Sequence, residues 1–472
     1  MPFQIVKQAL PGLRRAPLVD LSPALSRIEA EEVIDLALAL GNIDSPTGAE
    51  GAAAEYVFDW LTEQGLSPRR HALVADRFSV SAAIEGRGGG YGLILNGHLD
   101  TTLRPDAVWS AKDPLDRLYR GAWLEDDLIV GDGVVNDKGP VAACLVAAKA
   151  IHQSGIELPG DIIVTAVAGE IGREPVDEFE GTDYLSKDLG TRFMVTHGVV
   201  ADFALVAEGT GFGIVWAEPG MSIFKVTVFS DGPRYYTPYL PDRGALADAP
   251  NAIVRAAAVI AAFEDWASGY QTRFREDRAG GRIVPKASVN AIRSGYPYEP
   301  TSAPQVASFY VDTYLPPAAN PIDVREELRA VLRTAGVNGR VDLIVYRPGF
   351  EAVGVDRLVD TISRHHRARF GQDPAVVGPE VSSMWRDTNA FIELGIPAVS
   401  YAPRAASHAS RKAIRAQDLV DAAHVYAAVA IDIASQRREP WAPLGSHLNA
   451  LSDRADLTAG NSGTRVTQVT PA

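Results

Sequence analysis

Short apolar runs that alternate with helical segments constrain the fold of this chain most. Residues 162–167 and 203–207 are continuous apolar runs, which is typical of strands buried on both faces. Residues 26–40 have apolar side chains near helical spacing, which predicts a helix, and residues 141–151 are predicted to form a helix of small apolar residues. This alternation predicts an α/β class fold, an α/β/α sandwich with a mostly parallel sheet.

The pattern changes after about residue 219. A strand at 222–229, a helix at 251–267, strands at 287–294 and 307–315, a helix at 321–334 and a strand at 340–346 follow in order. This order is that of a ferredoxin-like α+β domain. We therefore expect a core domain of residues 1–218 and 348–439 and an inserted domain of residues 219–347. The polar, aperiodic tail of residues 440–472 is expected to lack a fixed structure.

Charge and cysteine content narrow the function. The chain has 45 Lys and Arg against 59 Asp and Glu residues, a net charge of −14, which does not favour nucleic acid or an anionic membrane as a partner. The single cysteine, Cys144, excludes an intrachain disulfide and a cysteine-rich metal site. No apolar run reaches the ~18 residues of a membrane span, and no secretory leader is evident, so we expect a cytoplasmic protein.

Residues capable of binding a metal follow the predicted strands. In open α/β sheets, ligands gather beyond the carboxyl ends of strands. A strand ends in His98-Leu99-Asp100, where the imidazole can bind a metal and Asp100 can accept the other ring N–H. A surface histidine at a strand end remains the alternative. The other candidates are Asp137 in a glycine-rich loop, which is also suited to capping a helix, Glu170, Glu208 and His408.

As a set, these motifs resemble the zinc metallohydrolase family of acetylornithine deacetylase, succinyl-diaminopimelate desuccinylase, aminoacylase and glutamate carboxypeptidase. The resemblance covers residues 34–433 and makes the inserted domain a lid and dimerisation domain. It implies one or two divalent ions, zinc, manganese or cobalt, in each subunit, and a homodimer or larger homo-oligomer formed through the lid. By this resemblance, His98 and Glu208 bind one metal, Glu170 and His408 bind the second, Asp137 bridges both and Asp100 orients His98 as a catalytic residue.

The sequence departs from the family where the general base is expected. The family has two adjacent glutamates, of which the first takes a proton from water and the second binds metal. Here the pair reads Gly169-Glu170, and glycine cannot transfer a proton. A general base is worth about 10²–10⁴-fold in rate. Glu174, Asp177 or Glu178 is a candidate replacement, although a solvated charge run is the other interpretation of that segment.

The predicted lid departs as well. Tyr236 occupies the place of a histidine that reaches across the dimer to the oxyanion in the family. A tyrosine O–H can still donate a hydrogen bond, so Tyr236 is a candidate catalytic residue. Asn290 matches a substrate-binding asparagine of the family, and Tyr314 replaces its usual arginine.

These departures predict a metal-dependent hydrolase of a C–N bond in a small carboxylate-bearing substrate that is not an ordinary peptidase. The most specific form of this prediction is hydrolytic deamination of an aromatic amine by metal-bound hydroxide with release of ammonia. In this respect the chain would be similar to 5-nitroanthranilate aminohydrolase. An amidase, deacylase or carboxypeptidase with a relocated base and a catalytically inactive metal- or ligand-binding protein are the alternatives. The aromatic candidates for stacking on the ring are Tyr235, Tyr236 and Trp385, and those for binding the carboxylate are Arg234, Arg347 and Arg386.

Overall fold

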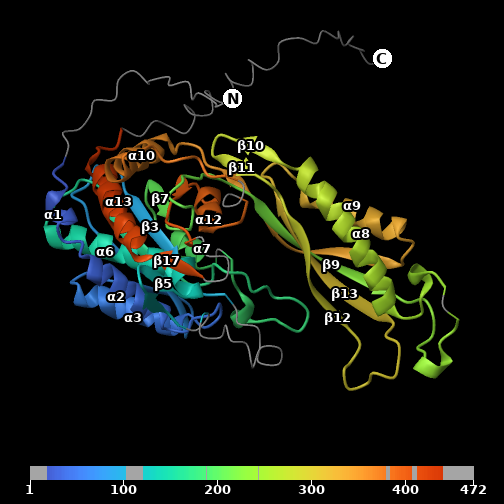
Figure 1. The fold of residues 1–472 in the computed structure, drawn as a ribbon. Coiled ribbons are helices and arrows are strands. Elements are labelled where there is room, and N and C mark those ends of the chain that lie inside the picture. Colours follow the sequence, from blue (N-terminus) through green and yellow to red (C-terminus); the bar gives the residue numbers. More distant parts are fainter. Residues whose placement is uncertain are drawn as a thin grey trace, which may run out of the picture.

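The computed structural model describes residues 19–102, 118, 121–187, 189–242, 244–378, 383–406 and 412–439. The predicted tail, residues 440–472, lies outside the described residues. Two β-sheets dominate the described part, each with its own helices and its own buried core (Figure 1). None of the described helices combines the length and apolar character needed to cross a membrane.

The larger sheet has six strands. Their order is β1 (Arg69–Val74), β2 (Arg77–Ile84), β6 (Ile162–Val167), β3 (Leu93–His98), β7 (Phe203–Val206) and β16 (Ala398–Ser400). The last four are mutually parallel, while β2 runs antiparallel to β6, and β1 to β2. The predicted mostly parallel sheet is therefore confirmed, and the carboxyl ends of β3, β6 and β7 meet at one edge.

Helices cover both faces of this sheet. Alternate side chains of β3 point to opposite faces: Leu93 and Leu95 join one apolar cluster and Ile94 joins another. The first cluster includes residues of α1 (Ser22–Leu25), α2 (Ala30–Gly41), α3 (Gly51–Glu63), α6 (Gly139–Ser154), α10 (Asp356–Phe370) and α13 (Ala416–Ser435). The second includes residues of α7 (Leu189–Thr196) and α12 (Asp387–Glu393). The predicted α/β/α sandwich is confirmed.

The smaller sheet is antiparallel throughout. Its order is β12 (Ala287–Ser294), β13 (Val306–Leu315), β9 (Gly220–Phe229) and β14 (Gly339–Arg347). Its apolar face packs against α8 (Ala252–Arg273) and α9 (Pro321–Thr334) in a separate core. In chain order these elements run β-α-β-β-α-β, the predicted ferredoxin-like arrangement. We call residues 220–347 the antiparallel unit; it lies at the right of Figure 1.

Two short strands form the junction between the two sheets. The chain passes from the six-stranded sheet to the antiparallel unit through β8 (Ala217–Glu218), and it returns through β15 (Phe350–Glu351). They pair antiparallel with each other, so the crossing segments form a ribbon. The remaining strands are the hairpin of β10 (Glu276–Arg278) and β11 (Gly281–Ile283) and the small sheet of β17 (Ala413–Arg415), β5 (Leu128–Val130) and β4 (Trp123–Glu125).

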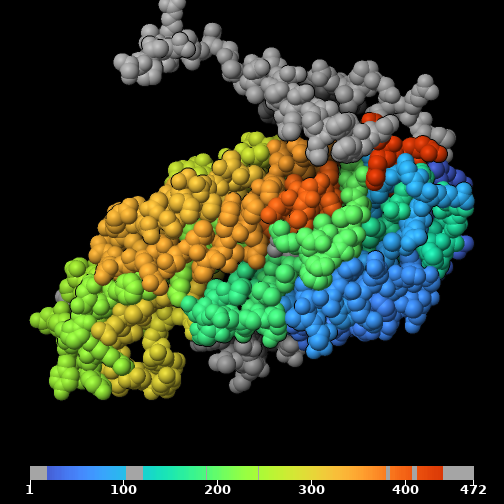
Figure 2. Space-filling view, turned by 180° about the vertical axis from the view of Figure 1, so that it is seen from behind, coloured from blue at the N-terminus to red at the C-terminus, as the bar shows by residue number. Residues whose placement is uncertain are grey.

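Viewed from behind, the molecule has two lobes, the antiparallel unit and the six-stranded sheet with its helices (Figure 2). A connecting segment, residues 171–187, runs from the end of β6 towards α7. Its Asp177 accepts hydrogen bonds from Lys225 of β9 and Tyr310 of β13, and its Glu178 from Arg293 of β12. The segment therefore ties the lobe of the six-stranded sheet to the antiparallel unit.

Candidate metal centre

The carboxyl end of β3 places His98 where β6 and β7 also end. Asp137 approaches it from the short π-helix η1 (Val134–Lys138), which directly precedes α6, and its Oδ2 accepts a hydrogen bond from the backbone N–H of His98 at 3.3 Å. A Cβ at Gly97 would lie only 2.7 Å from that same Oδ2. Since real Cβ contacts are not this short, a side chain at position 97 would force the Asp137 carboxylate to shift from this position.

Three predicted ligands form a compact cluster here. One ligand atom each from His98, Asp137 and Glu208 lies within 4.8 Å of the other two, and all three residues are buried. Glu170 lies beside them, with its Oε2 3.9 Å from His98 Nε2, and Glu208 Oε2 is 3.6 Å from the same nitrogen. The fifth predicted ligand, His408, lies outside the described residues.

The chemistry of this cluster fits a divalent cation. Asp137 Oδ1 is buried and has no hydrogen-bond partner among the described residues. Burial and the nearby charge of Glu208 raise the pKa of Asp137 well above its ordinary value, and burial also raises the pKa of Glu170. Burial disfavours the charge of His98, but Asp100, Glu170 and Glu208 together still raise its pKa well above the ordinary value. Such a site is stabilised by added positive charge.

Asp100 supports the cluster rather than joining it. His98 Nδ1 contacts the backbone carbonyl of Asp100 at 2.9 Å and its carboxylate Oδ1 at 3.4 Å. The carboxylate also accepts hydrogen bonds from the backbone N–H groups of Glu170 and Ile171 and from the hydroxyl of Thr47. Despite burial, these contacts with His98 and the donors lower the pKa of Asp100. The arrangement leaves Nε2 of His98 directed at the cluster.

The predicted lid residues lie on the antiparallel unit. Tyr236 is 58% exposed and forms a backbone bridge with Ser302. Arg234 pairs with Glu299 on the exposed surface. Tyr235 lies beside them, and Asn290 lies exposed on β12 at a register shift of its pairing with β13. Within the single described chain, their positions belong to a different lobe from the cluster.

The other two predicted carboxylate-binding arginines are also paired within the chain. Arg386 is 1% exposed and its Nη1 donates to Glu218 Oε1 at 2.7 Å. Arg347 donates to both carboxylate oxygens of Glu174, at 2.9 and 3.2 Å. Burial raises the pKa of Glu218 to about 7 even though Arg386 opposes that shift. Both arginines therefore stabilise internal carboxylates in this structure.

The three carboxylates predicted as replacements for the missing base are all paired within the described part of the chain. Gly169 itself has a φ of +76°, and a Cβ there would lie 3.1 Å from Arg77 Nη2 and beside the backbone of residues 185–186. Glu174 pairs with Arg347, Asp177 with Lys225, and Glu178 with Arg293. These three acidic residues thus bind basic side chains of the antiparallel unit, while Asp177 and Glu178 also remain exposed to solvent.

Lys187 is a site residue that we did not predict. Its side chain is 12% exposed, and its Nζ lies 3.6 Å from Glu170 Oε1 and 5.6 Å from the centroid of the Trp385 ring. Burial opposes its charge, but Glu170 and Tyr314 raise its pKa above the ordinary value. Lys187 follows Glu170 by seventeen positions, in a stretch rich in charged residues, so no local sequence pattern distinguishes it.

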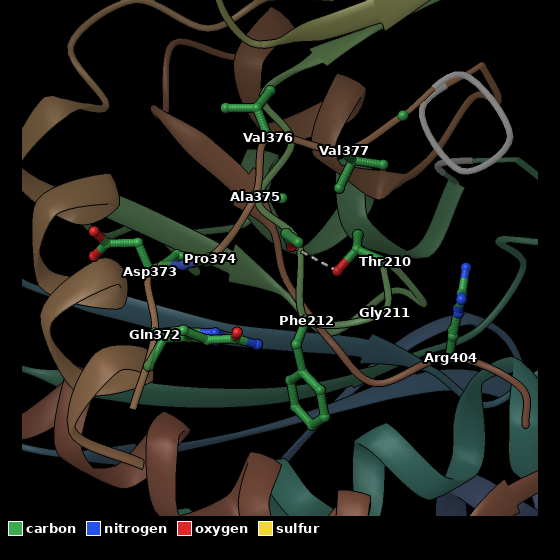
Figure 3. A pocket seen from close by; sticks show the side chains of 13 residues that line it. Thr210, Gly211, Phe212, Gln372, Asp373, Pro374, Ala375, Val376, Val377 and Arg404 are labelled. Atoms are coloured by element: carbon green, nitrogen blue, oxygen red, sulfur yellow. Dashed lines mark hydrogen bonds between the residues drawn. The ribbon is translucent and has the colours of Figure 1, made fainter. Parts of the chain in front are cut away.

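A surface pocket of about 390 Å³ opens beyond the cluster. It lies between residues 210–213, which follow Glu208, and residues 372–378, with Arg404 at its side (Figure 3). The hydroxyl of Thr210 already donates to the backbone oxygen of Gly213, and His366 Nδ1 contacts the Tyr401 hydroxyl. Because the lining includes none of the predicted metal ligands, the pocket is separate from the cluster.

Comparisons with known proteins agree with this geometry. The model of Peptidase family M20/M25/M40 matches residues 94–432. The N-formyl-4-amino-5-aminomethyl-2-methylpyrimidine deformylase of Bacillus subtilis (strain 168) is 30% identical over 221 residues, which are 43% of this chain and 46% of that protein. The chain thus spans about half the length of this curated relative.

Two solved structures share the fold. Human carnosine dipeptidase 1 has a TM-score of 0.64 at 15% identity, covering 89% of this chain and 100% of that one. The Bacillus subtilis YXEP protein, a dinuclear metal binding peptidase from the M20 family, has a TM-score of 0.56 at 14% identity, covering 86% and 99%. At these identities the likeness shows the fold alone.

Proposed function

Because the chain belongs to peptidase family M20/M25/M40, we propose that it is a metal-dependent hydrolase of a C–N bond in a small carboxylate-bearing substrate. His98, Asp137, Glu170 and Glu208 hold the divalent ion or ions, together with the predicted ligand His408. The bound ion supplies a Lewis acid that lowers the pKa of water towards neutrality. Asp100 fixes the orientation of His98, so the ligand set is preorganised.

The specific reaction we propose is hydrolytic deamination of an aromatic amine of the 5-nitroanthranilate type. Water adds to the ring carbon that bears the amino group, the C–N bond breaks, and the amine leaves as ammonia with one proton of the water. The charge of the intermediate spreads into an electron-poor ring, so this reaction depends less on a general base and an oxyanion donor at fixed positions.

The observation that favours deamination over amide hydrolysis is the lack of a general base around Gly169 in the described part of the chain. Glycine has no proton-transferring side chain, and the three nearby acidic residues are each paired with a basic residue of the antiparallel unit. Amide hydrolysis in this family relies on a carboxylate base at that place. Its loss, with no unpaired substitute among Glu174, Asp177 and Glu178, favours a reaction that does without it.

An amidase or deacylase is the second candidate. The match to a deformylase at 30% identity favours it, since removal of a formyl group from nitrogen is amide hydrolysis. In that case a carboxylate other than those three would take the proton. A catalytically inactive metal-binding protein is the third reading, and it predicts metal binding without turnover.

Product analysis separates these readings. The full chain is loaded separately with zinc, manganese and cobalt and given nitro-substituted aminobenzoates, N-formyl aminopyrimidines, N-acyl amino acids and dipeptides. Ammonia from the aminobenzoates is the expected result, and His98→Ala is the metal-ligand control. Formate or amino acid release alone overturns deamination in favour of the second candidate. A metal-loaded protein that turns over none of them supports the third.

We also propose that the chain forms at least a homodimer through the antiparallel unit, which corresponds to the predicted lid of residues 219–347. Its edge strand β12 carries Ile292, which is 52% exposed. Tyr236 and Asn290 lie on the same unit and would reach a site only from a second copy. Light scattering coupled to size-exclusion chromatography tests this, and a monomer at assay concentration contradicts it.

A further inference from the structure

A lysine ammonium lies beside the candidate metal centre, whereas the three predicted carboxylate-binding arginines are each paired with a carboxylate that is not a predicted metal ligand. We propose that Lys187 binds the anionic group of the substrate, and that the substrate carries a carboxylate close to the C–N bond that is cleaved. This inference rests on the proposed function, because it assigns a specificity-determining residue to the same site. The observation behind it is the position of Nζ, 3.6 Å from Glu170 Oε1.

Lys187 differs from the three predicted arginines in what it contacts. Arg386 and Arg347 are held by Glu218 and Glu174, and Arg234 lies on the surface with Glu299. The carboxylate partner of Lys187 is a predicted metal ligand. When a cation shares Glu170, the attraction of that carboxylate for the ammonium weakens, and the positive charge of Lys187 is left to attract an anion.

The donors of Lys187 also remain available. An ammonium group carries three N–H donors. Within the described part of the chain, Nζ makes no hydrogen bond, because its contact with Glu170 at 3.6 Å is an ion pair beyond hydrogen-bonding length. A carboxylate that enters the site can therefore accept from this group without displacing a protein acceptor.

The lysine stem is held in place by its surroundings. A Cβ at Gly172 would lie 3.5 Å from the Cε of Lys187, an ordinary van der Waals distance, so the lysine stem runs close beside the backbone of residue 172. On the other side, the ammonium lies over the ring of Trp385, which is 3% exposed and packs with Met221 and Tyr314. Because the stem is ordered before a ligand arrives, binding costs less side-chain entropy.

Binding measurements test the inference without requiring turnover. Calorimetry compares benzoate with benzamide, an uncharged analogue of the same shape, on the metal-loaded full chain. Lys187→Met should weaken benzoate binding by about 10- to 100-fold, as expected for a lost hydrogen bond to a charged group, and change benzamide binding little. Lys187→Arg, which keeps the charge, should retain most of the preference for benzoate.

The controls separate substrate binding from a structural role. Lys286→Met removes an exposed lysine that bonds Gln271 on the antiparallel unit and should leave both affinities unchanged. Metal content and thermal unfolding are measured for every variant. Equal losses for both ligands, loss of metal from Lys187→Met, or a wild-type protein without preference for benzoate each overturn the inference. Failure of the proposed reaction appears only in the product assays, so the two outcomes remain distinguishable.

Discussion

The carboxylate of Asp100 accepts a hydrogen bond from the backbone N–H of Glu170 at 2.9 Å. This contact joins the end of β3 to the end of β6, so that one carboxylate positions both His98 and the segment that carries Glu170. The second oxygen accepts from the backbone of Ile171 at 2.7 Å and from Thr47 at 2.8 Å. Asp100 therefore organises two strand ends at once.

Replacing Asp100 by asparagine should weaken metal binding by about 10–100-fold, the usual cost of losing a group that orients a metal ligand. The new amide N–H₂ would face backbone donors where a carboxylate oxygen accepts now. A chelator-competition titration measures the affinity. Asp59→Asn on the exposed side of α3 is the matched control. Unchanged affinity in Asp100→Asn would show that His98 is oriented by other contacts.

Removing the metal should lower thermal stability more at pH 8 than at pH 5.5. Burial raises the pKa of both Asp137 and Glu170. A carboxyl with a raised pKa favours the folded state below its ordinary pKa, and that stability is lost as pH rises through the raised value. At higher pH the cation must therefore balance more negative charge. Calorimetric unfolding with and without chelator checks this, and a pH-independent difference would contradict it.

Gly169→Ala should destabilise the protein by about 1–3 kcal/mol, because residue 169 has a φ of +76°. Gly336→Ala is a useful comparison, since it has a φ of +68° with nothing near the added Cβ. The loss at position 169 should be the larger one, because Arg77 is held by Glu50 and cannot easily move away. Urea unfolding measures both.

Gly169→Glu should reduce activity rather than restore a peptidase reaction. The added side chain starts from a strained backbone and points towards Arg77 and the backbone of residues 185–186. Product assays before and after the change test this. Increased hydrolysis of acyl amino acids would argue for the amidase reading, with Gly169→Ala controlling for backbone strain alone.

Arg386→Met should cost about 3–5 kcal/mol of stability at pH 8, because it removes the charged partner of the buried Glu218 carboxyl group. Burial raises the pKa of Glu218 in the folded protein to about 7. The protonated Glu218 carboxyl group therefore stabilises the folded state below the ordinary pKa of glutamate, and this stabilisation is lost as pH rises through about 7. The variant should therefore be less impaired at pH 6 than at pH 8. Equal losses in urea unfolding at the two pH values would contradict this assignment.

Local sequence patterns predicted the longer elements well. Residues 162–167, 287–294 and 321–334 are strands and a helix with the bounds expected from the sequence pattern. The helix predicted at 26–40 corresponds to α2, which begins only at Ala30, and the separate short helix α1 precedes the predicted range. The sequence analysis missed the strands β4, β5 and β17 of the small sheet. Each has three residues, which is too short for an alternation of apolar and polar side chains to be recognised.

The sequence by itself determined the α/β/α class, the inserted β-α-β-β-α-β order and the position of the candidate metal ligands at the ends of strands. These follow from local periodicity and from the rule that parallel strands present their carboxyl ends at one edge. Only the tertiary structure decided which charges meet. Arg386 pairs with Glu218, 168 positions away, and Arg347 pairs with Glu174, 173 positions away, while Lys187 lies against the predicted metal ligand Glu170. Ion pairs form between residues that folding brings together, and a side chain's charge carries no information about its partner's position in the chain.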